Sequence, residues 1–476
     1  MRTLVLRNHK LNQQGDSMAS TTEPPFAPAP PHRREMEKYS DGDMEAAMQE
    51  PEDPADRDGP QRFRAVKGSN LDRLRAYNLS AVLTSLHHDG PRSRSGLATA
   101  TGLNRSTVTI LVNELIDLGL AVEPVRSADD GAKKSVGRPS VDVDVSDHVF
   151  AIAVAPEVDA IRVGVVGLGG RVRKIIHYDT GSVLTMRETV SIASVIIQGI
   201  LTMLPENASV VGVGVAVPGL TNDEDGSVSL APQLGWRSEP LASELRDATG
   251  LPVRAANDAH LGLLAEISFG GSSHAGSAIY LNGGANRIGG GIMSGGHLLK
   301  GSSGYAGELG HFRIRSGGDR DSAGLQGTLE SEVNRDALVD SLGLDRRDFH
   351  RLDEELARRR SPRTQAEVNR QIDALGTALG TMVTIFNPDL IILGGFLGSL
   401  LDAEPVRLRN VIARESLAPQ LSAVRIVRPT LGAENLLIGA AELAFQPLLS
   451  DPGNADWLVR ASEAEADAGE HIAETR

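Results

Sequence analysis

The hydrophobic positions of residues 93–119 repeat with the spacing of two consecutive helices. The first helix is expected over Ser95–Thr101, and Gly102 supplies the tight turn that follows it. Asn104 is a good N-cap for the second helix, and Gly119 suits the left-handed conformation that ends many helices. The expected buried stripe of the second helix consists of Val108, Leu111, Val112, Leu115 and Leu118.

The opposite face of the second helix is mostly polar, with short side chains. Besides the apolar Ile110, its candidate contact residues are Arg105, Ser106, Thr107, Thr109 and Asn113. Such a face suits a DNA major groove, where Ile110 can meet a thymine methyl group. An ordinary helical hairpin with a solvated face is the alternative. A preceding helix over Asn70–His87 would complete the three-helix unit of a helix-turn-helix domain, which favours DNA binding.

The sequence after this hairpin reads as a strand, a polar loop and a second strand, which is the pattern of a wing. The loop carries Lys133, Lys134 and Arg138, which we expect to contact DNA. The extended Gly137-Arg138-Pro139 would place Arg138 in a minor groove, although an arginine in a loop is as often merely solvated. The sequence therefore predicts a winged helix-turn-helix domain over residues 65–145.

The next three hundred residues alternate between apolar strands and amphipathic helices. Strands are expected at Val149–Val154, Ile161–Val166, Val210–Val217 and Leu390–Leu393. Helices are expected at Met186–Met203, Ala256–Phe269, Gln365–Phe386 and Ala433–Leu448. This alternation predicts an α/β architecture over residues 148–450.

Composition narrows the class of protein. The 476 residues carry a net charge of −14 but include no cysteine, which excludes disulfides and thiolate metal sites. Residues 61–140 reverse the sign, with 12 Lys and Arg against 7 Asp and Glu, so a local basic patch remains compatible with DNA. Neither a membrane span nor an export signal is present, so we expect a cytoplasmic protein without a membrane partner.

The two ends of the chain read differently from its middle. Residues 1–60 hold eight prolines and few large apolar side chains, which predicts disorder. Met18 and Met36 are alternative translation starts within them. Residues 451–476 are acidic and are expected to form a loose tail.

Three motifs of the large domain resemble the ROK family of repressors, open reading frames and sugar kinases. They are Asn257-Asp258-Ala259, Gly307-Glu308-Leu309-Gly310-His311 and the stretch GLQGTLE that ends at Glu330. The segments VGVAVPGL at 213–220 and NPDLIILGGFLG at 387–398 add to the resemblance. It implies two actin-like lobes of the ribonuclease H-like, sugar-kinase type with a sugar cleft between them. It also implies assembly as a homodimer or homotetramer.

The resemblance assigns sugar binding to five polar residues, namely Asn257, Asp258, Glu308, His311 and Glu330. Carboxylates accept hydrogen bonds from sugar hydroxyls, while asparagine and histidine can both donate and accept. In kinases of this family the residue that matches Asp258 is the base for the attacking hydroxyl. The alternative for Asn257-Asp258 is a helix N-cap that needs no ligand.

The segments that correspond to the phosphate-binding loops and the zinc loop of the family differ from the family's sequence pattern. The first phosphate loop reads Ala155-Pro156-Glu157, so an aspartate is missing, a backbone donor is lost and a negative charge is added. The second reads Ala285-Asn286-Arg287 where kinases have Gly-Thr-Gly. Losing both loops should abolish phosphoryl transfer. Asp321, Ala323 and Thr328 replace the family's zinc cysteines, so His311 alone remains and no metal or other cofactor is expected.

These features predict a sugar-responsive transcriptional repressor with an operator DNA partner and no enzymatic activity. One alternative is an ATP-dependent sugar kinase with an added DNA-binding domain. Another is a regulator whose cleft meets a protein or nothing. The altered phosphate loops argue against the kinase.

Overall fold

The computed structural model describes residues 3–6, 70–123, 142–271, 275–284, 287–345, 351–358, 360–454 and 459–460. Nearly all of them belong to one compact unit, Met1–Asn8 with Leu74–Arg476, and the description below concerns this unit. Most of the predicted disordered segment and of the acidic tail lies outside the described residues. The domain boundaries drawn from the sequence stay predictions.

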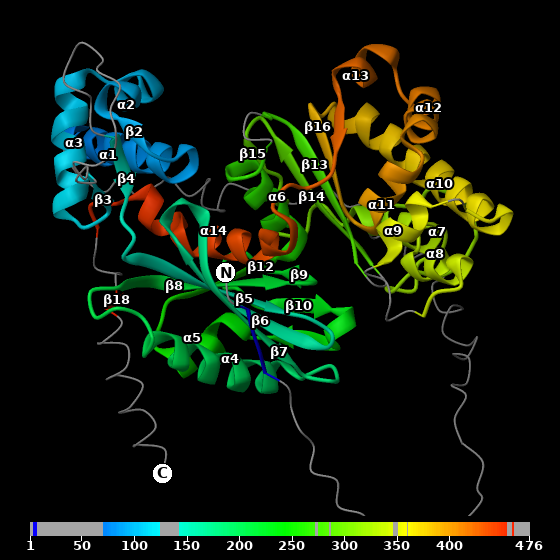
Figure 1. Cartoon of the computed structure of the whole chain (residues 1–476), viewed down its shortest axis with the longest axis horizontal. Coiled ribbons are helices and arrows are strands. Elements are labelled where there is room, and N and C mark those ends of the chain that lie inside the picture. The colour runs from blue at the N-terminus through cyan, green and yellow to red at the C-terminus, as the bar shows by residue number, and fades with distance from the viewer. Residues whose placement is uncertain are drawn as a thin grey trace, which may run out of the picture. The chain divides into compact units, whose positions relative to one another are not determined.

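The described part of the N-terminal region forms a head with three helices and three short strands (Figure 1). They are α1 (Asn70–Asp89), β2 (Arg92–Ser93), α2 (Arg94–Thr101), α3 (Arg105–Asp117), β3 (Ala121–Val122) and β4 (Asp142–Val145). The predicted cap is confirmed, because the Asn104 side chain accepts a hydrogen bond from the backbone of Thr107. Gly102 and Gly119 have φ of 71° and 72°, so both lie in the left-handed region predicted for them. Strand β4 pairs antiparallel with β2 and β3.

The first lobe is built on one mixed sheet in the order β1-β7-β6-β5-β8-β12, with β18 beside β8. Its strands are β1 (Thr3–Leu6), β5 (Val149–Pro156), β6 (Ala160–Gly167), β7 (Arg171–Asp179), β8 (Ser209–Val217), β12 (Val253–Asn257) and β18 (Val459–Arg460). Helices α4 (Met186–Leu201) and α5 (Leu241–Thr249) cover one face, and α14 (Asn435–Ser450) covers the other (Figure 1). A smaller sheet joins β9 (Leu220–Thr221), β10 (Val228–Ala231) and β11 (Trp236–Glu239).

The second lobe repeats this plan with the sheet order β15-β14-β13-β16-β17. Its strands are β13 (Ala278–Gly283), β14 (Ile288–Ser294), β15 (His297–Leu298), β16 (Leu390–Gly395) and β17 (Arg425–Val427). Its helices are α6 (Asp258–Ser268), α7 (Leu329–Glu332), α8 (Arg335–Leu342), α9 (Leu352–Ala357), α10 (Pro362–Phe386), α11 (Phe396–Ala403), α12 (Pro405–Glu415) and α13 (Ala418–Ala423).

Both lobes have the same topology, which identifies the fold. In each lobe three antiparallel strands are followed by two strands that join in parallel on the far side of the first. Parallel neighbours need long crossover connections, and helices supply these in both lobes. The predicted α/β fold with two actin-like lobes is confirmed.

Two local predictions were wrong. The helix expected over Ala256–Phe269 begins only at Asp258, because Val253–Asn257 pairs in parallel with β8 as a buried strand. Within the segment expected to be disordered, Thr3–Leu6 forms a strand parallel to β7. Its Leu-Val-Leu run has strand character that the proline-rich composition of the whole segment obscured.

A shared hydrophobic cluster joins the head to the first lobe. It includes Leu83 of α1, Leu115 of α3 and Phe445 of α14, all of them at most 1% exposed. The Ser80 hydroxyl also donates to the carbonyl oxygen of Leu449 at 2.6 Å. The head is thus packed on α14 rather than tethered by a linker alone. In the described part of the chain, no helix has the length and hydrophobicity to cross a membrane.

Candidate functional site

The structure places the predicted polar face of α3 on its outside. Arg105, Ser106 and Asn113 are exposed, and the apolar Ile110 keeps 64% of its surface exposed. Thr107 and Thr109 are half-buried beside them. The opposite side packs into the head through Val108, Leu111, Val112 and Leu115. Leu118, which was predicted for the same buried stripe, is instead the half-buried residue that caps the end of the helix. The face has the shape and polarity that major-groove contact requires.

Two hydroxyl groups of this face already donate within α3. The Ser106 hydroxyl donates to the capping oxygen of Asn104 at 2.7 Å, and the Thr109 hydroxyl donates to the carbonyl oxygen of Arg105 at 2.8 Å. The hydroxyl oxygens remain able to accept. In this arrangement Ser106 and Thr109 are suited to accept from base amino groups rather than to donate to phosphates.

Arg94 orients Asn113 from the start of α2. Its guanidinium donates to the side-chain oxygen of Asn113 at 2.8 Å and to Glu123 at 2.9 Å. The NH2 group of Asn113 remains able to donate. The sequence analysis did not single out Arg94, although an arginine at the start of the first helix of the motif was a signal that could have found it. Lys133, Lys134 and Arg138 lie outside the described residues, so their contact with DNA stays a prediction.

A buried polar cluster lies where α1 meets α14. Nε2 of His87 is 2.8 Å from one carboxylate oxygen of Glu442, and Nε2 of His88 is 2.8 Å from the other. The backbone N–H of Gly169 donates to Nδ1 of His87 at 2.9 Å. Since Nδ1 accepts, the proton of a neutral His87 is on Nε2 and is donated to Glu442. We name His87, His88 and Glu442 the junction cluster.

The junction cluster keeps its carboxylate ionised although it is buried. Burial acts to raise the pKa of Glu442, but the electrostatic attraction of both histidines and the hydrogen bonds that they donate lower that pKa to about 2. The ring of Phe269, at the end of α6, meets both imidazoles edge-on with centroid separations of 5.1 and 5.4 Å. The junction cluster therefore joins the head to α14 and to the end of α6.

The other end of α6 enters the cleft through Asn257 and Asp258. The Asn257 side chain accepts from two backbone N–H groups of α6 and donates to the carbonyl oxygen of Gly219 at 3.0 Å. Asn257 is therefore the N-cap that the sequence left open as an alternative. Asp258 is 4% exposed, and one of its oxygens forms an ion pair with Arg287. Sequence reasoning missed this pairing.

Arg287 is the cation among the predicted sugar-binding carboxylates. Burial lowers the pKa of its guanidinium to about 10, while the charges of Glu308, Glu330 and Glu157 act to raise it. Burial also raises the pKa of Glu308, against the opposing charges of His311 and Arg287. The carboxylates thus have a protein cation among them, which partly offsets their negative charge.

Glu330 and Asp321 hold the loop that resembles the family's zinc loop. Glu330 accepts from the backbone N–H groups of Ile288 and Ser322, both at 2.9 Å. Asp321 accepts from Nδ1 of His311 at 2.8 Å and from the Thr328 hydroxyl at 2.9 Å. Two of the positions that replace zinc cysteines therefore form a hydrogen-bonded network around the remaining histidine. In this state both oxygens of Glu330 have protein partners.

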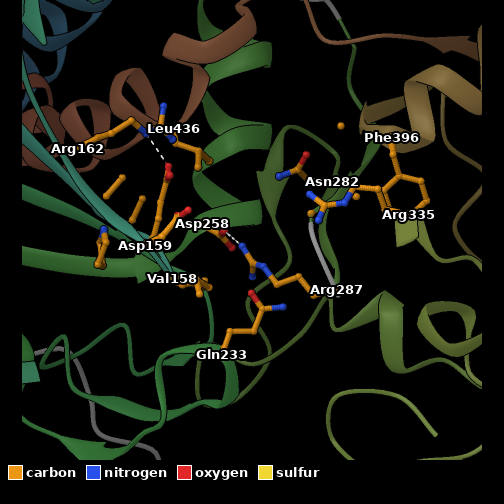
Figure 2. A pocket seen from close by; sticks show the side chains of 18 of the residues that line it. Val158, Asp159, Arg162, Gln233, Asp258, Asn282, Arg287, Arg335, Phe396 and Leu436 are labelled. Atoms are coloured by element: carbon orange, nitrogen blue, oxygen red, sulfur yellow. Dashed lines mark hydrogen bonds and ion pairs between the residues drawn. The ribbon is translucent and has the colours of Figure 1, made fainter. Parts of the chain in front are cut away.

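Two cavities meet beside these residues. The first has a volume of about 500 Å³ and is lined by Asp258, Arg287 and Gln233, among others (Figure 2). The second, of about 570 Å³, is lined by Asp321, Glu330 and again Gln233. Gln233 lies in the turn between β10 and β11, and it was not predicted. Of the predicted sugar-binding residues, Asp258 lies on the wall of the first cavity and Glu330 on that of the second, with Gln233 on both. Asn257, Glu308 and His311 are not among the described residues that line either cavity.

The place of the first phosphate loop lies on the wall of the first cavity. Ala155 and Pro156 end β5, and the tight turn to β6 is closed by a bond from the Glu157 backbone to the carbonyl oxygen of Ala160. The Glu157 carboxylate accepts from Arg162 at 2.6 Å. A phosphate at this place would meet a carboxylate and find no N–H on Pro156. Ala285 and Asn286 of the second loop lie outside the described residues.

Comparison with known proteins agrees with this geometry. A sequence model of the ROK family matches residues 158–446. The xylose repressor of Caldicellulosiruptor bescii is 28% identical over 406 residues, which is 80% of this chain and 99% of that protein. The glucokinase of Streptomyces coelicolor is 29% identical over 258 residues, which is 50% of this chain and 81% of that enzyme.

A solved structure extends the fold similarity to most of the chain. A ROK family transcriptional regulator, a homologue of the Mlc protein of E. coli, superposes with a TM-score of 0.65 and 24% identity. The superposition covers 80% of this chain and 98% of the other. At this identity the likeness concerns the fold.

Proposed function

Because this chain belongs to the ROK family, we propose that it is a DNA-binding transcriptional repressor whose effector is a sugar or sugar derivative. The observation that carries the proposal is the exposed polar face of α3 on a head packed against a kinase-like domain. The effector would bind between the lobes, and the head would carry its influence to DNA.

The extent of the similarities supports a regulator. The repressor similarity covers 80% of the chain, whereas the family model covers residues 158–446, about three-fifths of it. The repressor similarity must therefore continue beyond the kinase-like part. The glucokinase similarity covers 50% of the chain and needs no such extension. A head with a recognition helix accounts for the difference.

The cleft supports a sugar effector through the polar residues of its two cavities. Asp258 and Glu330 line them and offer acceptors, while Glu308 and His311, which can accept or donate, are the other candidates from the sequence. Asn257 and Glu330 have protein partners in the present arrangement, so a sugar would have to share or exchange these bonds. Asp258 remains the strongest candidate, since it lines the first cavity and one of its oxygens has no partner among the described residues.

The alternative function is that of a sugar kinase. Two observations favour it, namely the presence of Asp258 at the position of the catalytic base and the similarity to a glucokinase. Asp258 matches the catalytic base, but one oxygen of its carboxylate is already taken by the ion pair with Arg287. Arg287 itself comes from the place of the second phosphate loop. We therefore propose that the cleft binds sugar without phosphorylating it. Micromolar ATP binding by calorimetry, or sugar phosphate formed from ATP, would contradict this.

The DNA proposal is tested by selecting binding sites from genomic fragments with the purified protein. We expect an inverted repeat, because a symmetric homodimer or homotetramer presents two recognition helices to successive turns of DNA. Arg105→Ala or Asn113→Ala should cost roughly 1–3 kcal/mol of specific binding free energy if the residue contacts a base. Arg187→Ala on the exposed side of α4 is the matched control. Equal affinity for all sequences, unchanged by these substitutions, would refute the assignment of this face.

A further inference from the structure

Two polar atoms on the wall of the first cavity lack a hydrogen-bond partner among the described residues. They are one carboxylate oxygen of Asp258, Oδ1, and the side-chain nitrogen of Gln233, Nε2. Both atoms are buried, and the other oxygen of Asp258 is taken by Arg287. A buried polar atom without a partner costs stability, so a native protein that retains two of them on one cavity wall calls for a ligand.

The two atoms have opposite hydrogen-bonding character. An ionised carboxylate oxygen accepts only, and an amide nitrogen donates only. A hydroxyl group can satisfy both, since its oxygen accepts while its proton is donated. An ammonium group donates and cannot accept from Gln233. A phosphate group accepts and would be repelled by Asp258.

The charged groups on the wall of the first cavity are matched in number. They are Arg162, Arg287, Arg335 and Arg428 against Glu157, Asp159, Asp258 and Asp353. Arg162 is paired with Glu157, Arg287 with Asp258 and Arg428 with Asp353. The recognition of a neutral hydroxyl therefore rests on the two atoms described above, where an anionic group would meet the Asp258 carboxylate.

The position of Gln233 suits it to read this hydroxyl. It lies in the 3-10 turn Pro232–Leu234 of the first lobe, while Asp258 begins α6, which packs on the sheet of the second. Figure 2 shows Gln233 reaching into the part of the cavity that holds the Asp258–Arg287 pair. A ligand bound to both would contact segments from both lobes.

We propose that Gln233 is a specificity-determining residue of the effector site. Its Nε2 donates to the oxygen of one ligand hydroxyl, and that hydroxyl donates its proton to Oδ1 of Asp258. The group recognised here is a neutral hydroxyl rather than a phosphate ester or an amine. This inference rests on the proposed function, because it assumes that the cleft takes a sugar.

The test compares Gln233→Leu and Gln233→Glu with Gln198→Leu. Gln198 of α4 is the matched control, because its buried side-chain nitrogen also has no partner in the described part of the chain, but it lines neither cavity. D-xylose, D-glucose and D-glucose 6-phosphate are titrated by calorimetry into each purified full-length protein. We expect the neutral sugar that binds the parent to bind Gln233→Leu about tenfold more weakly, the loss of one hydrogen bond. Gln233→Glu should bind it more weakly still, and Gln198→Leu should bind it as the parent does.

Thermal unfolding without sugar gives a second readout. Each leucine variant removes a buried donor that has no partner, so its unfolding temperature should equal or exceed that of the parent. A lower temperature for Gln233→Leu alone would mean that Gln233 is structural, which would overturn the inference.

The remaining outcomes separate the inference from the function on which it rests. Equal sugar affinity in Gln233→Leu and the parent would overturn the role of Gln233 and leave the sugar-responsive function standing. Tighter binding of D-glucose 6-phosphate than of D-glucose would overturn the preference for a neutral hydroxyl. If the parent binds none of the three compounds, the sugar proposal itself fails, and the inference fails with it.

Discussion

The junction cluster and the cleft are both buried, polar and charged, but only the junction cluster is completed by the protein itself. In the junction cluster, both oxygens of Glu442 have imidazole partners, and Nδ1 of His87 has the Gly169 backbone. In the cleft, Asp258 and Gln233 each retain an atom without a partner among the described residues. The two regions therefore face different selective demands: one must hold its parts together, and the other must leave room for a partner.

This contrast gives a criterion for distinguishing structural from functional polar clusters. A buried charge is tolerated when hydrogen bonds and opposite charge surround it. The junction cluster meets that condition alone, so its removal should affect folding first. The cleft meets it only in part, so its removal should affect ligand binding more than folding.

His87→Leu should destabilise the protein more than any cleft substitution. It removes the fully buried partner of Glu442 and leaves a buried carboxylate with His88 alone. Breaking a buried pair in this way costs about 3–5 kcal/mol of the free energy of unfolding. Chemical denaturation measures the loss, and His297→Leu on exposed β15 is the control, expected within about 0.5 kcal/mol of the parent. A cost for His87→Leu no larger than that of the control would mean that the junction cluster does not hold the head.

The pH dependence of stability should report Glu442. Its folded pKa of about 2 lies below the ordinary value of 4.5, so its contribution is present above pH 4.5 and is lost as the pH falls through about 2. A shift of this size corresponds to roughly 3 kcal/mol. Glu442→Gln should remove this part of the acid dependence. Identical acid profiles for the parent and Glu442→Gln would show that the carboxylate is not held ionised by its neighbours.

Particular residues show how far the sequence could predict these regions. The turn, the cap at Asn104 and the buried stripe of α3 were predicted because they depend on neighbours a few residues away. The ROK fold was predicted because its motifs are local, and both predictions are confirmed. Glu442 is 355 residues from His87, and Arg287 is 29 residues from Asp258. Such pairings depend on tertiary contacts, so no local sequence pattern predicts them.

The loop around Asp321 should behave as a second cluster that the protein completes by itself, without zinc. Asp321→Ala removes the acceptor shared by His311 and Thr328, and we expect a loss of about 1–3 kcal/mol. Excess chelator should leave the unfolding temperature of the parent unchanged. Elemental analysis measures the zinc content directly, and one zinc per chain would contradict the prediction.

Asp258→Asn should cost less stability than the junction substitutions but more ligand affinity. The amide keeps the shape of the side chain but removes the ion-pair partner of Arg287. Because other carboxylates remain near Arg287, we expect the free energy of unfolding to fall by only about 1–2 kcal/mol. Sugar affinity should fall about tenfold, while operator affinity without sugar should stay within about twofold. Calorimetry and DNA-binding titrations provide the measurements. Unchanged sugar affinity would make Asp258 structural and would remove it from the site.

His88→Gln should have the smallest effect and thereby define the edge of the junction cluster. The His88 side chain is 28% exposed, whereas that of His87 is fully buried, and both bond the same carboxylate at 2.8 Å. Glutamine can still donate to Glu442, and water can reach the place that the imidazole leaves. The expected cost is therefore about 0.5–1 kcal/mol of the free energy of unfolding, the range of one partly solvated hydrogen bond.

The two single variants and the double variant form a double-mutant cycle, measured by chemical denaturation. A cost for His88→Gln equal to that of His87→Leu would show that exposure does not matter here and that the two histidines act as one unit. A smaller cost would place the restraint on the head at His87 and its bond from Gly169.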